Sequence, residues 1–312
     1  MRVIFMGTPE FSVGTLEALI AAGHEVCLAV TQPDKPKGRG RAMQAPPVKE
    51  RAEFYGIPVC QPKRVRDPEC VEELRKFNAD VIVVVAFGQI LPKSILELTP
   101  YGCINVHASL LPKYRGAAPI QWAIIDGETV TGVTTMQMDE GLDTGDMIMK
   151  TEVPITEDET GDTLHDKLAA AGAQLCVETL KALEDQTASF EKQGDSPTAY
   201  AKMLTKELGN IDWNCPAVQI GRLIRGLNSW PGAYTRWNGK VMKIWKAKAE
   251  TCEKPQADPG TVVSVGKNEF AVQTGDGILR VLEVQMPGKK RMETGAFLRG
   301  NTMEPGSVLT SE

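Results

Sequence analysis

The chain has 312 residues, of which 42% are hydrophobic and 24% are charged, and its net charge is −5. This composition predicts a globular protein of one large or two smaller domains, and no apolar run approaches the roughly 18 residues of a membrane-spanning helix. Seven scattered cysteines without a C-x-x-C pair, and only three histidines, argue against a disulfide framework and against a metal site. We therefore expect a cytoplasmic protein that holds no metal.

Apolar runs and helical repeats alternate along the first 185 residues, which predicts an α/β domain with a parallel sheet. Its opening β-α-β unit implies a right-handed crossover between parallel strands. The turn at Gly7 has neither a G-x-G-x-x-G nor a P-loop sequence, which argues against a dinucleotide or triphosphate site. Strands are expected over 2–6, 25–31, 58–60, 80–86, 130–138 and 147–153, with a further one starting at Cys103. Helices are expected over 9–22, 47–55, 67–77, 93–98, 118–126 and 162–185.

Residues 32–48 interrupt this pattern. Four prolines bracket the run Gly38-Arg39-Gly40-Arg41, and the wider region 32–66 carries nine Lys and Arg against three Asp and Glu. A loop of this length within an α/β unit is typically functional or disordered. Its mixture of glycine and basic residues favours an arm that becomes ordered on phosphates. A solvated linker is the alternative.

Beyond the last of these helices the pattern changes. Residues 189–205 are polar and contain Pro197, which predicts a linker between a domain over 1–188 and a domain over 206–312. Short apolar runs separated by glycine-containing turns then predict a small β-barrel. After a helix over 216–227, its strands are expected over 233–237, 240–248, 260–265, 270–274 and 278–285. This domain carries fifteen Lys and Arg against eleven Asp and Glu, which indicates either a basic face for nucleic acid or an unevenly charged surface.

The stretch from Cys103 to Pro119 is the strongest candidate for an active site. A buried strand there turns polar at Asn105 and His107, and residues two apart in a strand point to the same face. In parallel α/β sheets, ligands bind at the carboxyl ends of the strands. An imidazole at such a position can act as an acid or a base near neutral pH, and a neutral amide can stabilise a developing oxyanion.

The acidic turn over 139–146 is expected to supply a carboxylate that orients His107 and favours its charged form. The turn follows another strand and should lie at the same edge of the sheet, with Asp143 between two glycines. No strong nucleophile is evident, because Ser109 lacks the G-x-S-x-G elbow and Cys103 lies further inside its strand. The pattern favours direct acyl transfer between two bound substrates. A purely structural His–Asp pair is the alternative.

These motifs resemble a known family. The sequences Asn105-Val-His107-Ala-Ser109-Leu-Leu-Pro112 and Gly141-Leu-Asp143-Thr-Gly145-Asp are similar to the core of the 10-formyltetrahydrofolate-dependent formyltransferases. By themselves they fit the members that formylate glycinamide ribonucleotide equally well. Three more motifs extend the resemblance over nearly the whole chain to the members that formylate methionyl-tRNA. They are Gly7-Thr-Pro-Glu-Phe11, the basic loop with Gln32-Pro-Asp-Lys-Pro, and Asn228-Ser-Trp230-Pro-Gly.

The resemblance implies a Rossmann-like catalytic domain followed by an OB-like β-barrel domain that binds tRNA. It implies transfer of a formyl group from the co-substrate 10-formyltetrahydrofolate to the α-amino group of methionine on initiator methionyl-tRNA, for translation initiation. Three catalytic residues are carried over by motif: Asn105, His107 and Asp143. Folate contacts are carried over to two loops, at Ser109, Leu110, Leu111, Pro112, Phe87, Gln89 and Leu91. Contacts with the acceptor end of the tRNA are carried over to the basic loop 34–45, at Lys35, Lys37, Arg39 and Arg41.

Other functions stay open on the sequence alone. A formyltransferase acting on a small amine, such as a nucleotide or an amino sugar, would have no use for the basic loop or the barrel. A formyl-folate hydrolase would replace the amine by water, and a non-catalytic RNA-binding module would bind RNA through the barrel without formyl transfer. The main expectation is a monomer that acts on tRNA and has no membrane partner.

Overall fold

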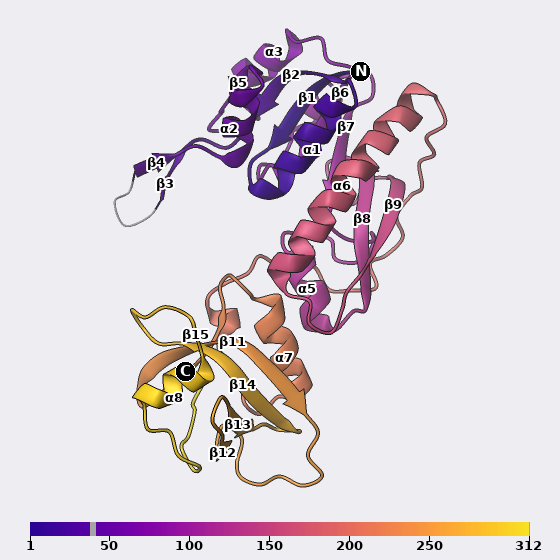
Figure 1. Cartoon of the computed structure of the whole chain (residues 1–312). Coiled ribbons are helices and arrows are strands. Elements are labelled where there is room, and N and C mark those ends of the chain that lie inside the picture. Colours follow the sequence, from indigo (N-terminus) through magenta and orange to yellow (C-terminus); the bar gives the residue numbers. More distant parts are fainter. Residues whose placement is uncertain (38–41, 312) are drawn as a thin grey trace. The chain divides into compact units, whose positions relative to one another are not determined.

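The computed structural model describes residues 1–37 and 42–311. The chain divides into two compact units, one built from 1–119, 130–154 and 165–201, the other from 120–129, 155–164 and 202–312 (Figure 1). The domain boundaries predicted from the sequence stay predictions, but the contacts assign most of the predicted linker to the first unit. In the part of the chain that the structure describes, no helix combines the length and the apolar character needed to span a membrane.

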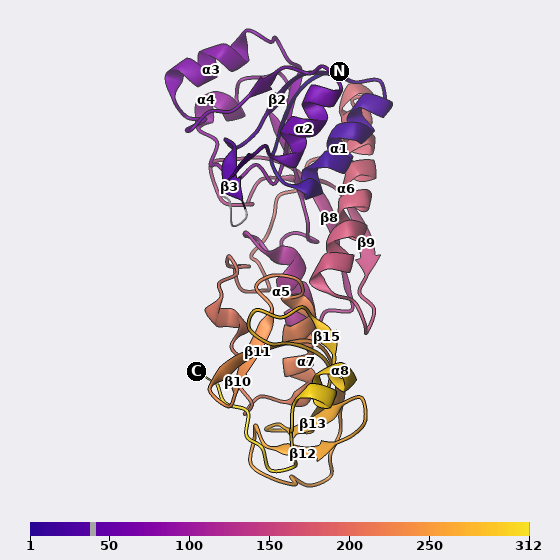
Figure 2. The same ribbon diagram turned by 60° about the vertical axis from the view of Figure 1, so that its left-hand side comes forward.

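The first unit contains a seven-stranded sheet that is covered by helices on both faces. Helices α1 (Glu10–Ala21) and α6 (Gly161–Glu184) lie side by side, and Figures 1 and 2 both show α6 running along β8 and β9. Helices α3 (Pro68–Arg75) and α4 (Lys93–Leu96) pack on an apolar core formed with the central strands. The predicted α/β class with a Rossmann-like N-terminal domain is confirmed. In sheet order the strands are β5 (Val59–Cys60), β2 (Glu25–Val30), β1 (Arg2–Gly7), β6 (Val81–Val85), β7 (Cys103–His107), β8 (Val130–Gln137) and β9 (Met147–Pro154).

The sheet is mixed, whereas the sequence predicts a parallel one. The strands from β5 to β7 run parallel, but β8 pairs antiparallel with both β7 and β9. The loop between β8 and β9 is too short for a crossover, which needs a dozen or more residues. The connection from β7 to β8 contains α5 (Pro119–Asp126), most of which packs with the second unit instead of covering the sheet. Neither connection can therefore bring the next strand back in the same direction as the strand before it.

The predicted basic loop contains a short antiparallel hairpin, β3 (Lys35–Lys37) and β4 (Ala42–Gln44). The sequence predicts only irregular structure there, because its alternating lysine and proline residues lack the apolar period of a buried strand. Two prolines end the hairpin and open helix α2 (Pro47–Phe54). Proline suits the first helical position because that residue needs no intrahelical N–H partner.

The second unit is an antiparallel β-barrel, as the sequence predicts. Its sheet order is β10 (Ala233–Trp237), β11 (Lys240–Glu250), β14 (Ile278–Gln285), β13 (Phe270–Gln273) and β12 (Val262–Val265), and β15 (Met292–Glu293) pairs with β14. The end of the chain joins the two outer strands. Thr310 pairs with Arg236 of β10, and Val262 of β12 donates a backbone hydrogen bond to Ser307.

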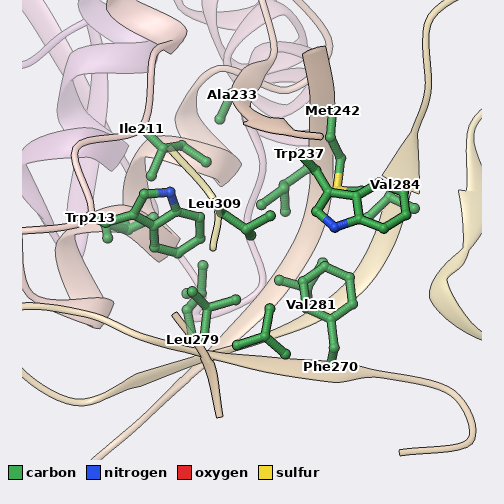
Figure 3. Packing of buried hydrophobic residues seen from close by; sticks show 14 of the residues in the cluster. Ile211, Trp213, Ala233, Trp237, Met242, Phe270, Leu279, Val281, Val284 and Leu309 are labelled. Carbon is green, nitrogen blue, oxygen red and sulfur yellow. The ribbon is translucent and has the colours of Figure 1, made fainter. Parts of the chain in front are cut away.

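The barrel encloses an apolar core of aromatic and aliphatic side chains (Figure 3). The rings of Trp237 and Phe297 meet edge to face with their centroids 5.3 Å apart. Trp213 donates its indole N–H to the hydroxyl of Thr235 at 3.0 Å, so this buried polar group is satisfied. Helix α8 (Thr294–Gly300), which contributes Phe297, is not predicted from the sequence because it is only two turns long.

Two earlier stretches of the chain, 120–129 and 155–164, pack with helix α7 (Ala217–Gly226) in the second unit. A Cβ atom on Gly226 would lie 2.7 Å from Ile125 of α5. Arg225 donates a hydrogen bond to the carbonyl oxygen of Glu159 at 3.0 Å. The barrel unit is therefore completed by residues 120–129 and 155–164, which precede the rest of it in the chain.

Candidate active site

His107 ends β7 and lies at the centre of the candidate site. It is 6% exposed, and Asn105, on the same face of the strand, is 9% exposed. The imidazole Nε2 donates a hydrogen bond to the carbonyl oxygen of Tyr114 at 3.0 Å, so Nε2 carries a proton. Nδ1 lies 3.7 Å from Oδ1 of Asp143. This is the separation of an ion pair and exceeds that of a hydrogen bond, so a proton on Nδ1 remains available to a substrate.

Asp143 reaches His107 from the loop between β8 and β9, but not for the reason that the sequence suggests. The expectation that β8 ends at the same sheet edge as β7 is wrong, because β8 runs antiparallel and its last residue, Gln137, pairs with Ile104. The loop folds back instead. Oδ2 of Asp143 accepts a hydrogen bond from the backbone N–H of Gly116 at 2.9 Å. The carboxylate therefore joins the loop after β7 to the imidazole that β7 carries.

Two glycines let these loops approach their neighbours. A Cβ atom on Gly145 would lie 1.7 Å from the carbonyl oxygen of Gln137. A Cβ atom on Gly116 would lie 2.6 Å from the carbonyl oxygen of Ala201, and Gly116 has a φ of 125° that side chains disfavour. Any side chain at either position would displace the backbone around Asp143.

The Asn105 carboxamide has no hydrogen-bond partner among the residues that the structure describes. Its neighbour on the same face, Cys103, is fully buried, and burial raises the pKa of that thiol to about 12. Cys103 therefore carries no thiolate near neutral pH, and the site lacks a cysteine nucleophile. Within residues 1–37 and 42–311, no group of three or more His, Cys, Asp and Glu side chains is arranged to hold a metal ion.

The loop after His107, predicted to contact folate, is held by Thr134 of β8. The Thr134 hydroxyl donates to the carbonyl oxygen of Ser109 at 2.7 Å and accepts from the backbone N–H of Leu111 at 3.0 Å. The Ser109 hydroxyl donates to the carbonyl oxygen of Lys113 at 2.6 Å, and Leu111 is buried. Both side chains thus stabilise the loop itself. The half-buried members of the predicted set are Leu110 and Pro112.

The side chains predicted to contact folate after β6 also point into the protein. Phe87 and Leu91 belong to the core beneath α3 and α4. The Gln89 carboxamide donates to the carbonyl oxygen of Pro62 at 3.1 Å and accepts from the backbone N–H of Val65 at 2.8 Å. These three side chains are therefore engaged within the protein, and the large exposed side chain of this loop is Ile90.

The loops after four parallel strands meet at one edge of the sheet. Val84 of β6 pairs with Asn105 of β7, so the loop after β6 starts beside the candidate site. The Thr8 hydroxyl and the Gln32 amide both donate to the carbonyl oxygen of Phe87, at 3.0 and 3.2 Å. These contacts join the loops after β1 and β2 to the loop after β6. This is the edge at which the sequence predicts ligand binding.

The residues predicted to bind tRNA belong to the hairpin region. Lys35 is exposed at the start of β3, and Lys37 ends that strand. Arg39 and Arg41 lie outside the described residues. The structure thus places Lys35 at the surface of the basic hairpin.

The base of this hairpin is fixed by Asp34. Its carboxylate accepts hydrogen bonds from Gln61 Nε2 at 2.8 Å and from Lys49 Nζ at 2.9 Å. These hydrogen bonds, that from Gln61 first, hold the pKa of Asp34 below its usual range. The hairpin is therefore anchored at its base to Gln61, which follows β5, and to Lys49 of α2.

Sequence reasoning missed three residues that hold the site together: Thr134, Gln193 and Thr198. Gln193 and Thr198 lie in the predicted linker, yet both contact loops of the active site. Each acts through hydrogen bonds to residues more than 20 positions away in the sequence. No periodicity or motif marks such a residue in one sequence.

Both halves of the chain match one known family. Residues 1–180 match the family described as Formyl transferase, and residues 203–302 match Formyl transferase, C-terminal domain. A methionyl-tRNA formyltransferase of Agathobacter rectalis is 63% identical over 310 residues, which cover 99% of this chain and 100% of that protein. A methionyl-tRNA formyltransferase of Lachnospira eligens is 57% identical over 313 residues, which cover 99% of each.

A solved structure of WlaRD, a sugar 3N-formyl transferase in the presence of dTDP and 5-N-formyl-THF, shares the fold. The match covers 93% of this chain and 99% of that one, with a TM-score of 0.67 and 19% identity. At this identity the likeness extends to the fold alone.

Proposed function

We propose a function on the premise that the chain belongs to the formyl transferase family and, within it, to the methionyl-tRNA formyltransferases. The proposed reaction transfers the formyl group of 10-formyltetrahydrofolate to the α-amino group of methionine carried by initiator tRNA. The observation that carries this proposal is the identity of 63% along 99% of the chain, which includes both units. The meeting of His107 and Asp143 beside Asn105 supplies the chemistry.

The reaction needs a nucleophilic amine and a stabilised oxyanion. An α-amino group has a pKa of about 7.7–8.0, so a usable fraction of it is neutral near pH 7. When this nitrogen attacks the formyl carbon, negative charge develops on the formyl oxygen. The bond from carbon to the α-nitrogen forms, the bond from carbon to the folate nitrogen breaks, and one proton passes from the first nitrogen to the second.

Asn105 and His107 would stabilise the developing charge. In acyl transfer, preorganised hydrogen-bond donors to such an oxygen usually lower the activation barrier more than any other single effect. The Asn105 amide has no partner among the described residues and can donate. Protonated His107 would donate through Nδ1, because Nε2 is held by Tyr114. The Asp143 carboxylate lies 3.7 Å from Nδ1 and would face the positive charge of that ring.

The two substrates would approach from different parts of the molecule. The folate would lie against the loops after β6 and β7, with the 139–143 turn near its pterin ring. The acceptor end of the tRNA would meet the hairpin through Lys35, Lys37, Arg39 and Arg41. We assign catalysis to residues 1–188 and further tRNA binding to the barrel over 206–312, joined by 189–205, in a cytoplasmic monomer.

Incubation of the protein with 10-formyltetrahydrofolate and initiator methionyl-tRNA tests the proposal. We expect formyl-methionine on the tRNA, at a rate that falls with rising salt because phosphate contacts release counterions. Parallel reactions contain an amino-sugar nucleotide, glycinamide ribonucleotide or no acceptor. Formylation of a small amine but not of the tRNA would overturn the assignment. Loss of the formyl group without any acceptor would instead indicate a hydrolase.

A further inference from the structure

The stretch Glu191–Ala201 is packed against the active-site loops of the first unit. It starts as a partner of β9, where Glu191 and Met147 exchange two backbone hydrogen bonds of 2.8 and 2.9 Å. It ends at Ala201, which exchanges backbone hydrogen bonds of 2.8 Å with Arg115 and Ala117. Between these two anchors lie two polar side chains that have partners in the candidate active site.

The first of them, Gln193, holds the loop that carries Asp143. Its Nε2 donates to the carbonyl oxygens of Asp143 at 2.9 Å and of Gly145 at 2.7 Å. Its Oε1 accepts a hydrogen bond from Arg115 Nε at 2.9 Å. This arrangement uses both functions of an amide side chain. A glutamate carboxylate at this position could accept a hydrogen bond but could not donate the other two.

The second, Thr198, holds the loop that orients His107. Its hydroxyl oxygen accepts a hydrogen bond from the backbone N–H of Tyr114 at 2.7 Å. The carbonyl oxygen of the same Tyr114 accepts the Nε2 proton of His107. Tyr114 has a φ of 54°, a conformation that a bulky residue keeps only when its surroundings hold it.

We propose that Gln193 and Thr198 are positioning residues for formyl transfer. Gln193 fixes the backbone that presents Asp143, and Thr198 fixes the backbone that orients His107. One short stretch of chain thus sets both members of the His–Asp pair. Neither residue touches the reacting atoms, and the inference rests on the proposed function.

The test compares Gln193→Met, Thr198→Val and Thr198→Ser with the parent protein. The first two remove the hydrogen bonds and keep the size of the side chain, and we expect each to lower kcat by about tenfold. The KM values for folate and tRNA should stay close to those of the parent. Thr198→Ser keeps the accepting oxygen and should restore the rate. Gln174→Ala is the control, because Gln174 lies on the exposed side of α6 and bonds with Glu178.

A second readout needs no substrate. The chain has three histidines, so the NMR signal of the His107 Nε2 proton can be assigned by substituting His24 and His165. Thr198→Val should shift this signal, because the Tyr114 carbonyl that accepts the proton is released, and Thr198→Ser should not. The proposal is overturned if kcat and the signal both stay at parental values. The proposal is also overturned if the fall in kcat comes with a comparable change in KM and with a loss of thermal stability. The role of the two residues would then be purely structural. A parent protein without formyl transfer would refute the proposed function, and the NMR comparison would then decide the positioning role by itself.

Discussion

His107 and Asp143 are held by backbone groups as well as by each other. The carbonyl of Tyr114 fixes one nitrogen of the ring, and the N–H of Gly116 fixes one oxygen of the carboxylate. Tyr114 and Asp143 have φ values of 54° and 56°. This left-handed conformation costs a residue with a side chain roughly 1–2 kcal/mol. Such conformations cluster at functional sites, where the surroundings maintain them.

Replacing Asp143 by asparagine isolates the effect of its charge. Asparagine keeps an oxygen for the N–H of Gly116, so the loop should retain its position. The negative charge 3.7 Å from Nδ1 of His107 is lost. We expect kcat to fall by about 10²–10³-fold in single-turnover formylation, with an unchanged melting temperature. Asp185→Asn, which alters a surface pair with Lys181, is the control. Near-parental turnover in Asp143→Asn would contradict the role proposed for this carboxylate.

The buried thiol of Cys103 should not react with alkylating reagents in the folded protein. Burial raises its pKa to about 12, so the thiol stays protonated at every pH below that value. We expect no alkylation of Cys103 by iodoacetamide at pH 8 in the folded protein, and full alkylation after unfolding, as measured by peptide mass spectrometry. Cys103→Ala should keep its formylation rate. Labelling of the folded protein at this position would show that the strand opens in solution.

At the scale of single residues, the sequence reveals the side chains that break a pattern. Asn105 and His107 stand out because two polar residues at a spacing of two interrupt an apolar strand. Thr134 and Gln193 break no pattern, since threonine is ordinary in a strand and a polar residue is ordinary in a linker. Their importance comes from tertiary hydrogen bonds, which a linear pattern does not contain.

At the scale of elements, apolar periodicity locates strands but not their direction. The predicted bounds of β8 and β9 agree with the structure to within one residue, yet β8 runs opposite to the expected sense. Direction depends on where the connecting helix packs, and α5 packs mainly with the second unit. The loop that carries Asp143 is therefore a hairpin loop that folds back over β7.

The fold of that loop should depend on Gly145. In Gly145→Ala the new Cβ would lie 1.7 Å from the carbonyl oxygen of Gln137, so the loop must shift and carry Asp143 with it. We expect a loss of about 1–3 kcal/mol in the free energy of unfolding by urea, together with a fall in kcat. Gly194→Ala is the matched control, because its Cβ would meet nothing within 4 Å. Equal stability and activity of the two variants would show that the loop has another available conformation.

The basic hairpin should act on tRNA and not on folate. We expect Arg41→Ala to raise the KM for methionyl-tRNA several-fold and to lower the slope of log affinity against log salt by about 1, because one phosphate contact is removed. Folate binding, measured by fluorescence quenching, should not change. The control is Lys76→Ala, because Lys76 directly follows α3 and pairs with Glu73 of that helix. Unchanged tRNA kinetics in Arg41→Ala would refute the role of this arginine.

At the scale of the whole molecule, the chain passes between its two units five times. The sequence predicts two consecutive domains, because the kind of element changes after the long helix α6. It does not indicate that 120–129 and 155–164 pack with the barrel unit, since an amphipathic helix shows that it has a partner but not which one. The sequence also does not predict that the chain end at Thr310 closes the barrel, because one or two paired residues produce no periodic pattern.

This division of the chain makes a prediction about fragments. A fragment that begins at Lys202 would lack Ile125, which packs on Gly226, and Glu159, whose carbonyl oxygen accepts from Arg225. Arg225 is half-buried, and burial lowers the pKa of its guanidinium. Losing the Glu159 carbonyl oxygen therefore removes a hydrogen-bond acceptor that offsets the free-energy cost of burying this charge. We expect the barrel of this fragment to be less stable than in the full chain by about 3 kcal/mol or more, in urea unfolding followed by tryptophan fluorescence. Adding the stretches 120–129 and 155–164 as peptides should restore part of the loss. Equal stability of the fragment and of the barrel within the full chain would show that the barrel folds independently of residues 1–201.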